Sequence, residues 1–286
     1  MGFYLFLRLG LLSARAFPFR RFSNLCARFG RLVGWLSPAR AHVSANLLAI
    51  HAAGGRSAQA GDVFESYGRY WGETLALAAR PERLKSLRFE VRGLEYLLEA
   101  QSRGPVCVLA GHTGNWDVLA HWLSREVPGI AIMVERLKPQ RLYELFARIR
   151  GALGCRILAA EGGGRELYRH FMAGGHAALA ADRVIGAGWR EATLLGGRRR
   201  LPSAGMDLAR RAGATLLPVF ILRDGINFVI QVHPPLAENE DPVVAYAHSL
   251  ECELTEAPEQ WCVLYPLHDG AAEAQPALAA RKAVAS

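Results

Sequence analysis

The residues best placed to do chemistry lie in one short stretch, residues 111–117, which read Gly-His-Thr-Gly-Asn-Trp-Asp. An apolar run at 105–110 precedes the stretch and an apolar-periodic segment follows it, so it is predicted to join a buried strand to a helix. Its histidine, His112, would stand at the mouth of a sheet, and the carboxylate of Asp117 could fold back onto the ring. This arrangement is suited to general-base catalysis of acyl transfer.

Spacing alone does not single out His112. Five of the nine histidines have an acid five residues further on. Only His112 also follows a buried-strand pattern and a glycine and opens a helix, so context selects it. A structural alternative stays open, in which Asp117 complements the helix dipole and His112 is an ordinary turn residue.

Length and composition indicate a globular protein. With 286 residues, 51% of them hydrophobic and 21% charged, the chain is long enough for one large α/β domain or two small ones, which excludes disordered and fibrous classes. The five cysteines form no C-x-x-C pair, and Cys107 and Cys155 lie in or beside predicted strands as small buried residues. This pattern favours a reducing compartment and disfavours a zinc site.

The net charge of +8 comes from the N-terminal region. No acidic residue precedes Asp62, whereas the first 61 residues contain eight arginines interleaved with Phe, Leu and Trp. Basic, aromatic and leucine residues together are typical of helices that lie at a membrane surface. Arginines interrupt every window of about 20 residues that could span a bilayer, and Arg8 interrupts the apolar core of a signal peptide. A nucleic-acid-binding arm would be more polar, and a genomic preference for arginine would not explain the missing acids.

Apolar runs alternate with helical patterns along most of the chain, which predicts an α/β fold with a mostly parallel sheet flanked by helices. We expect a basic amphipathic helical arm at 1–57, a main domain at 58–270 and a disordered tail at 271–286. Strands are predicted at 89–93, 105–110, 130–134, 155–158, 177–181, 215–222 and 226–232, and helices at 58–80, 94–102, 117–125, 139–153, 164–172 and 204–212. The last two strands would form an antiparallel hairpin at one edge of the sheet.

Charged residues directly follow several predicted strands. Besides residues 111–117, they are Glu135-Arg136 and Asp182-Arg183. Ligands of parallel α/β sheets bind at the carboxyl ends of the strands, so these side chains are expected to lie together there and to bind a ligand. The alternative is that they form a solvated rim in which the charges pair with one another. No nucleophile elbow, phosphate loop or metalloprotease motif occurs, which favours direct attack by a substrate hydroxyl. The remaining candidates for ligation lack metal-ligand spacing, so we predict no metal and a structural role for His170, His176, His233 and His268.

The stretch from His112 to Asp117 resembles the first motif of the glycerolipid acyltransferase superfamily. More of the chain is similar to its bacterial branch, the lipid A late acyltransferases (lauroyl and myristoyl transferases) and relatives that acylate phosphatidylinositol mannosides. The similar segments follow one another in order and cover most of residues 40–268: 135–139, 146–150 ahead of Gly154, 182–186, 195–197, 202–209, 214–218 and 258–261.

The resemblance implies transfer of an acyl chain from acyl carrier protein or acyl-CoA to a hydroxyl of a membrane glycolipid, such as a lipid A precursor, without metal or cofactor. It places the protein, as a monomer, on anionic lipid at the cytoplasmic face of the inner membrane, as a peripheral or monotopic protein, and implies no nucleic-acid partner. His112 would be the base and Asp117 would hold its ring. Arg136, Arg150 and Asp182 would bind the head group or the carrier's phosphopantetheine, or the arginines would stabilise the oxyanion. Asn115 and Arg183 are also assigned to substrate binding.

Three positions depart from the lipid A enzymes. Val184 replaces the second acid of a D-x-D-x-G pattern, the aromatic pair expected near 194–196 is absent, and the segment after Trp261 differs. The acceptor is therefore open between a lipid A precursor and another lipid such as phosphatidylinositol mannoside, and a non-catalytic lipid-binding relative is an alternative. A soluble esterase or a nucleic-acid binder is a third interpretation. The basic run 198–200 is either a solvated loop or a contact for a carrier protein, CoA or lipid.

Overall fold

The computed structural model describes residues 2–135, 138–152, 154–160, 162–185, 188–225 and 227–267. The chain forms two compact units. Unit 1 comprises residues 1–84, 194–199 and 254–286, and unit 2 comprises residues 85–193 and 200–253. The tail predicted at 271–286 lies outside the described residues, and the domain limits at 57 and 270 stay predictions.

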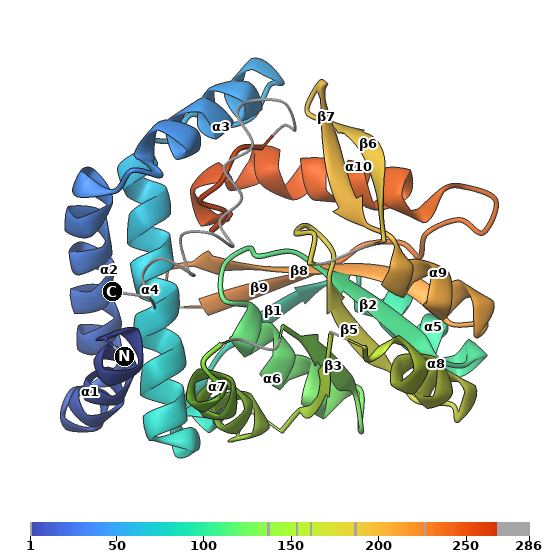
Figure 1. Ribbon diagram of the computed structural model, residues 1–286, viewed down its shortest axis with the longest axis horizontal. Coiled ribbons are helices and arrows are strands. Elements are labelled where there is room, and N and C mark those ends of the chain that lie inside the picture. The colour runs from blue at the N-terminus through green and yellow to red at the C-terminus, as the bar shows by residue number, and fades with distance from the viewer. Residues whose placement is uncertain are drawn as a thin grey trace. The chain divides into compact units, whose positions relative to one another are not determined.

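Unit 2 is built on a seven-stranded sheet with the order β1-β9-β8-β2-β5-β3-β4 (Figure 1). The pairs β1–β9, β8–β2, β2–β5, β5–β3 and β3–β4 are parallel, and β8–β9 is antiparallel. This confirms the predicted mostly parallel α/β fold. The strands are β1 (Phe89–Arg92), β2 (Val106–Ala110), β3 (Ala131–Val134), β4 (Arg156–Ala159), β5 (Ala177–Ala180), β8 (Thr215–Asp224) and β9 (Asn227–Val232).

The centre of the sheet is β2, flanked by β8 and β5. Residues 106–109 of β2 are fully buried, as are Phe220 and Ile221 of β8, because helices cover both faces. The register pairs Ala110 with Ala180 at the ends of β2 and β5. The segments that follow these two strands therefore leave the sheet side by side, which decides the geometry of the site.

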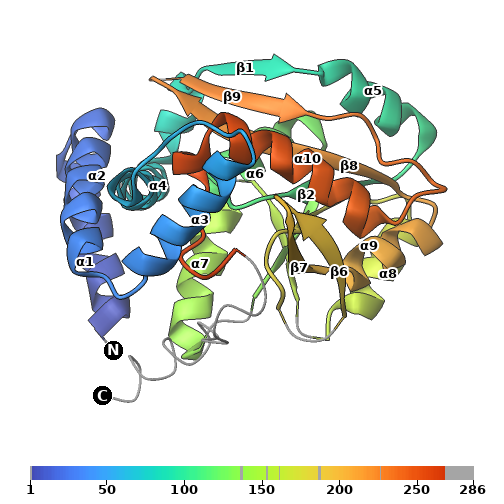
Figure 2. The same cartoon turned by 90° about the horizontal axis from the view of Figure 1, so that it is seen from above.

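Helices cover the sheet on both sides. α10 (Pro242–Glu256) lies on one face, where Tyr246 stacks on Phe220 with ring centroids 6.0 Å apart and its hydroxyl donates to the Ala110 carbonyl at 3.1 Å. α5 (Leu94–Arg103) and α6 (Trp116–Glu126) lie on the other face, as Figures 1 and 2 show together. The remaining helices of unit 2 are α7 (Gln140–Ala152), α8 (Gly164–Met172) and α9 (Ala204–Arg211).

Three features differ from the sequence-based expectation. The β8–β9 hairpin is not at the sheet edge, because β1 pairs outside β9. β6 (Trp189–Leu194) and β7 (Gly197–Pro202) form a two-stranded sheet that was not predicted; Leu195 and Gly196 both have positive φ, at 49° and 79°, as its two-residue turn requires. α10 was also missed.

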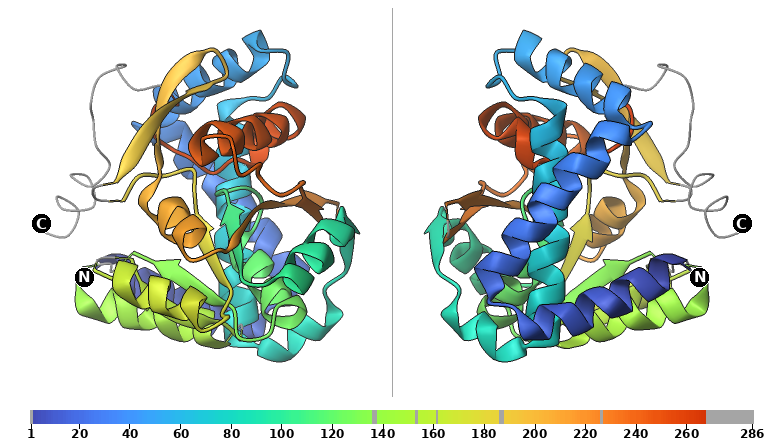
Figure 3. Two further views of the ribbon diagram at one scale, coloured as in Figure 1. Left: turned by 90° about the vertical axis from the view of Figure 1, so that its right-hand side faces the viewer. Right: turned by 90° about the vertical axis from the view of Figure 1, so that its left-hand side faces the viewer.

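Unit 1 contains α1 (Gly2–Ala16), α2 (Phe19–Leu36), α3 (Arg40–Ala52), α4 (Ala60–Ala79) and the short 3₁₀ helix η2 (Pro258–Gln260), and it ends within a second 3₁₀ helix, η1 (Pro81–Ser86). α2 and α4 run side by side (Figure 3). Glycines make this approach possible: a Cβ atom on Gly68 would lie 2.3 Å from the Cys26 carbonyl oxygen, and one on Gly30 would lie 2.8 Å from the Gly68 Cα. Small residues thus join the predicted N-terminal arm tightly to α4.

In the described part of the chain, none of the helices combines the length and apolar character that a membrane crossing requires.

Candidate active site

The turn between β2 and α6 carries His112 and is held at three points. Gly114 has φ of 51°, and a Cβ atom there would lie 2.3 Å from the Ile221 carbonyl oxygen, so a side chain would not fit. The Arg223 guanidinium, from β8, donates to the Gly114 carbonyl at 2.9 Å. Asn115 caps α6, and its side chain accepts from the backbone N–H of Val118 at 3.1 Å. The position of His112 is therefore set by β8 and by the helix start.

His112 is bound to Asp182 through two hydrogen bonds. Its Nδ1 lies 2.7 Å from Asp182 Oδ1, and its backbone N–H donates to Asp182 Oδ2, also at 2.7 Å. The two residues are 70 positions apart in the chain, but each lies two residues beyond one of the paired alanines, Ala110 and Ala180. The parallel register brings them together.

The pairing decides which nitrogen of His112 can act as a base. A carboxylate accepts hydrogen bonds, so Nδ1 carries the proton and donates it, and Nε2 keeps its lone pair. Asp182 is fully buried, whereas the His112 side chain is 21% exposed and its ring packs edge-on against Trp116 at 4.9 Å. A buried carboxylate behind a partly exposed imidazole is the arrangement that supports proton abstraction at Nε2.

Asp117 has a different partner from the one that the sequence suggested. Its Oδ1 lies 2.9 Å from Nε of Arg150, on α7, and the two side chains are 2% and 18% exposed. Asp117 lies in the first turn of α6, where a carboxylate also interacts favourably with the helix dipole, and the ring of His112 is held by Asp182. His112 pairs with Asp182 because the parallel register of β2 and β5 places His112 beside the residues that follow β5.

The other predicted site residues are placed as follows. Arg183 pairs with Glu135 at 3.2 Å, with both side chains about one-third exposed, as expected for a rim of paired charges. Asn115 is fully buried in its capping role. Arg136 lies outside the described residues. The structure thus brings together His112 with Asp182 and Asp117 with Arg150.

Two buried thiols of unit 2 are poor nucleophiles. Burial, reinforced by the negative charge of Asp117, raises the pKa of Cys155 to about 12. Burial alone raises the pKa of Cys107, on β2, still further above its usual range. Neither cysteine is therefore a good candidate for a thiolate nucleophile near neutral pH.

Most of the other histidines considered, and Arg199 of the basic run, form hydrogen bonds within the protein. His170 Nε2 and the His176 carbonyl oxygen lie 2.8 Å apart, and His176 Nδ1 accepts from the backbone N–H of Val106 at 3.0 Å. His233 contacts buried Glu253 at 2.7 Å and so links β9 to α10, while His268 lies outside the described residues. Arg199 is 4% exposed and donates to the carbonyls of Pro266 and Leu267, so the run 198–200 is not a wholly solvated loop.

In the described ranges, no three His, Cys, Asp or Glu side chains are grouped so that they could hold a metal ion.

Two functional features were missed from the sequence. Asp182 was predicted as a ligand for substrate. His112 and Asp182 each lie two residues beyond the end of their strand, but this indicates a contact only if β2 and β5 are known to be neighbours. Arg223 follows the apolar core of β8 and so lies at the same edge of the sheet, but the hairpin turn beside it explained its presence equally well.

Comparisons with known proteins match most of the chain. The sequence model of a family described as "Bacterial lipid A biosynthesis acyltransferase" matches residues 2–268. A phosphatidylinositol mannoside acyltransferase of Mycobacterium tuberculosis is 32% identical over 213 residues, which are 71% of this chain and 67% of that protein. A phosphatidylinositol mannoside acyltransferase of Mycolicibacterium smegmatis is 30% identical over 210 residues, 70% of this chain and 69% of that protein.

Proposed function

Because the chain belongs to the bacterial lipid A biosynthesis acyltransferase family and is an acyltransferase, we propose that it transfers a fatty acyl chain from a thioester to a sugar hydroxyl of a membrane glycolipid. The observation that carries this proposal is the pair formed by His112 and buried Asp182. The pair supplies a base, and no protein nucleophile is needed.

The proposed reaction is a single displacement. Nε2 of His112 removes the proton from the acceptor hydroxyl as its oxygen attacks the thioester carbonyl carbon. The new C–O bond forms and the C–S bond breaks when the tetrahedral intermediate collapses. The imidazolium, stabilised by the Asp182 carboxylate, returns the proton to the leaving thiol, so that ester and thiol are the products.

The other charged residues of the rim are given supporting roles. We assign Asp117 to holding Arg150 through their ion pair, in which the Arg150 side chain stays 18% exposed. Arg136 and Arg183 are assigned to the phosphates of the donor or acceptor, because arginine binds phosphate oxygens well. Asn115 acts by fixing the start of α6.

The acyl donor is proposed to be acyl carrier protein or acyl-CoA, both of which present a thioester. For the acceptor, the named relatives support a phosphatidylinositol mannoside type of glycolipid, and the family description supports a lipid A precursor. The two share a sugar hydroxyl near a phosphate. Val184 and the altered segment at 194–196 are departures from the lipid A pattern, so the mannoside type is the first acceptor to test.

The proposed place of action is the cytoplasmic surface of the inner membrane, where thioester donors occur. Three leucines of α1, at positions 5, 9 and 12, are 57%, 56% and 60% exposed and recur at helical spacing on one face. Exposed leucines among arginines are typical of helices that lie in a membrane interface.

His112→Ala tests the proposed chemistry. Purified protein, acyl-CoA or acyl carrier protein, and a mixed glycolipid extract are followed by mass spectrometry for a product heavier by one acyl chain. We expect transfer to fall by about 10²–10⁴-fold, because that is the usual contribution of a general base. Circular dichroism checks that the variant is folded. Transfer at the wild-type rate in a folded variant would refute the mechanism.

A further inference from the structure

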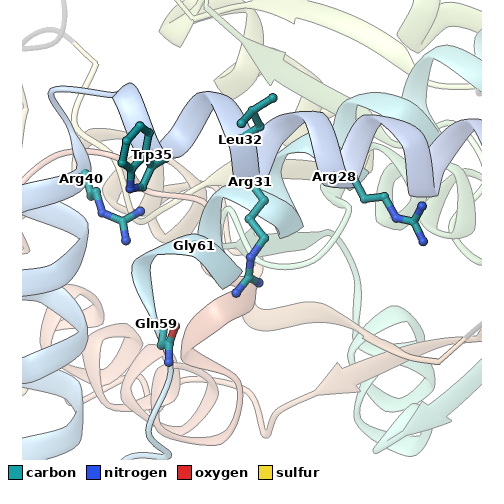
Figure 4. Close-up of a pocket in the computed structure, with 7 residues that line it drawn as sticks. All are labelled: Arg28, Arg31, Leu32, Trp35, Arg40, Gln59 and Gly61. Atoms are coloured by element: carbon teal, nitrogen blue, oxygen red, sulfur yellow. The ribbon is translucent and has the colours of Figure 1, made fainter.

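Unit 1 contains a hollow of about 370 Å³ beside the C-terminal half of α2. Arg28, Arg31, Leu32 and Trp35 of α2 line it, together with Arg40 and the start of α4 (Figure 4). We call this hollow the α2 groove. Figure 4 shows the Arg31 side chain on the side of α2 that faces Gly61 and the Leu32 side chain on the other side. The residues that line the groove thus include a basic wall, Arg28, Arg31 and Arg40, and an apolar edge, Leu32 and Trp35.

The basic wall carries uncompensated charge. Arg31 is paired with Asp62 at 2.7 Å and with Glu65 at 3.1 Å. In contrast, Arg28 and Arg40 form no salt bridge with any of the residues that the structure describes, and no acidic residue precedes Asp62 in the sequence. Two arginines therefore remain to bind an anion, and the guanidinium group suits a phosphate.

The apolar edge continues along α2. Leu25, Phe29, Leu32 and Leu36 recur at i, i+4, i+7 and i+11, and they are 56%, 53%, 63% and 75% exposed. Trp35, which lines the groove itself, is 69% exposed. A water-soluble anion would leave this apolar strip in water, whereas a lipid would cover it with its acyl chains, and tryptophan is favoured where an apolar and a wet layer meet.

We propose that the α2 groove is a binding site for the headgroup of an anionic phospholipid. Arg28 and Arg40 contact the phosphate-bearing headgroup, Trp35 lies at the level of the headgroups, and the apolar strip of α2 contacts the acyl chains. This lipid is a component of the surrounding membrane and is distinct from the acceptor that is acylated. The inference rests on the membrane-surface location proposed above and adds a defined site to it.

Vesicle binding of the full-length chain tests the site. Sedimentation compares phosphatidylcholine vesicles with vesicles that also contain phosphatidylglycerol. The groove variant is Arg28→Gln with Arg40→Gln, and the matched control, Arg8→Gln with Arg15→Gln, removes the same charge from exposed positions of α1. We expect the groove variant to lose about tenfold more affinity for the anionic vesicles than the control, because a defined site adds charge-assisted hydrogen bonds to general attraction. Equal losses would show attraction without a site and overturn the proposal.

Trp35 provides a second measurement. Brominated phosphatidylglycerol should quench the wild-type fluorescence more than that of Trp35→Phe, and Arg28→Gln with Arg40→Gln should reduce the quenching. Quenching that is independent of Trp35 would also contradict the proposal. A parallel assay with acyl carrier protein in place of vesicles covers the other acidic partner: weakened carrier binding with unchanged vesicle binding would assign the groove to the carrier. Vesicle binding needs no acyl donor, so its outcome is separate from that of the acyl-transfer assay.

Discussion

The two hydrogen bonds between His112 and Asp182 are the central observation at the scale of single residues. One of them holds the ring, and the other holds the backbone from which the ring projects. Together they orient Nε2 and select the tautomer that can accept a proton. We therefore propose for Asp182 the ring-holding role that the sequence suggested for Asp117, whereas Asp117 pairs with Arg150.

The first prediction concerns Asp182→Asn. Asparagine has one side-chain oxygen where aspartate has two, so it cannot accept the hydrogen bonds from both Nδ1–H and the backbone N–H of His112. The ring then loses its fixed tautomer, and the imidazolium loses its counter-charge. We expect kcat to fall by about 10²–10⁴-fold with a small change in KM. Steady-state kinetics with a fixed acceptor measure both constants. An unchanged kcat would remove Asp182 from the mechanism.

The second prediction concerns Asp117→Ala. It leaves the guanidinium of Arg150 largely buried without its carboxylate partner, and we expect the free energy of unfolding to fall by on the order of 3 kcal/mol. Urea denaturation measures this change. The double variant with Arg150→Met removes the unpaired charge as well, so its loss should be smaller than the sum of the two single losses. Additive losses would mean that the pair contributes nothing to stability.

At the scale of elements, the packing of α2 against α4 depends on backbone contact at glycines. The Cys26 carbonyl oxygen and the Gly68 Cα approach each other so closely that no side chain fits between the helices. The sheet of unit 2 depends instead on large apolar side chains such as Phe220 and Tyr246. We therefore expect the contact between α2 and α4 to be sensitive to the addition of a single methyl group.

Gly68→Ala tests the contact between α2 and α4. The added Cβ would lie 2.3 Å from the Cys26 carbonyl oxygen, so the helices must separate, and we expect a loss of about 1–3 kcal/mol in the free energy of unfolding. The matched control is Gly151→Ala in α7, where a Cβ meets nothing within 4 Å. That variant should gain ~0.5–1 kcal/mol from helix propensity alone. Thermal melts of both variants give the comparison, and stabilisation by both would contradict the close packing.

At the scale of the whole molecule, the chain carries its positive excess and its exposed leucines in the same N-terminal region. Exposing Leu5, Leu9 and Leu12 of α1 to water does not stabilise a soluble protein. In a protein that acts on a lipid acceptor, the same leucines can contact the membrane and so bring the protein close to its substrate. The proposed function and the N-terminal helices are consistent on this point.

Replacing Leu5, Leu9 and Leu12 together by serine tests membrane attachment by α1. All three are more than half exposed, so the fold should be retained, whereas flotation with anionic vesicles should fall at least about tenfold, because apolar burial in the interface is lost. The control changes Leu98 and Met172 of unit 2, exposed by 56% and 61%, to serine. An equal decrease in both proteins would show that the effect is general loss of apolar surface and would exclude α1 as the attachment site.

The sequence alone was sufficient for the parts of the molecule that follow from local pattern. Apolar runs and helical periodicity predicted the α/β class, the seven strands of the main sheet and the helices between them, because burial imposes those periods on the chain. Apart from the missed helix α10, the departures lie where tertiary pairing overrides local pattern. β1 covers the edge of β9, and the strands β6 and β7 contain too few apolar residues to be recognised from the sequence.

For the site, the sequence determined that His112 follows a buried strand and that acids and arginines gather at one edge of the sheet. Only the tertiary structure decided which acid holds the ring. The choice depends on the register of β2 with β5, which aligns residues 70 positions apart, and on the cap at Asn115, which turns Asp117 into the first turn of α6 toward Arg150. Register is a property of two paired strands, so it cannot be predicted from the local sequence pattern of either strand.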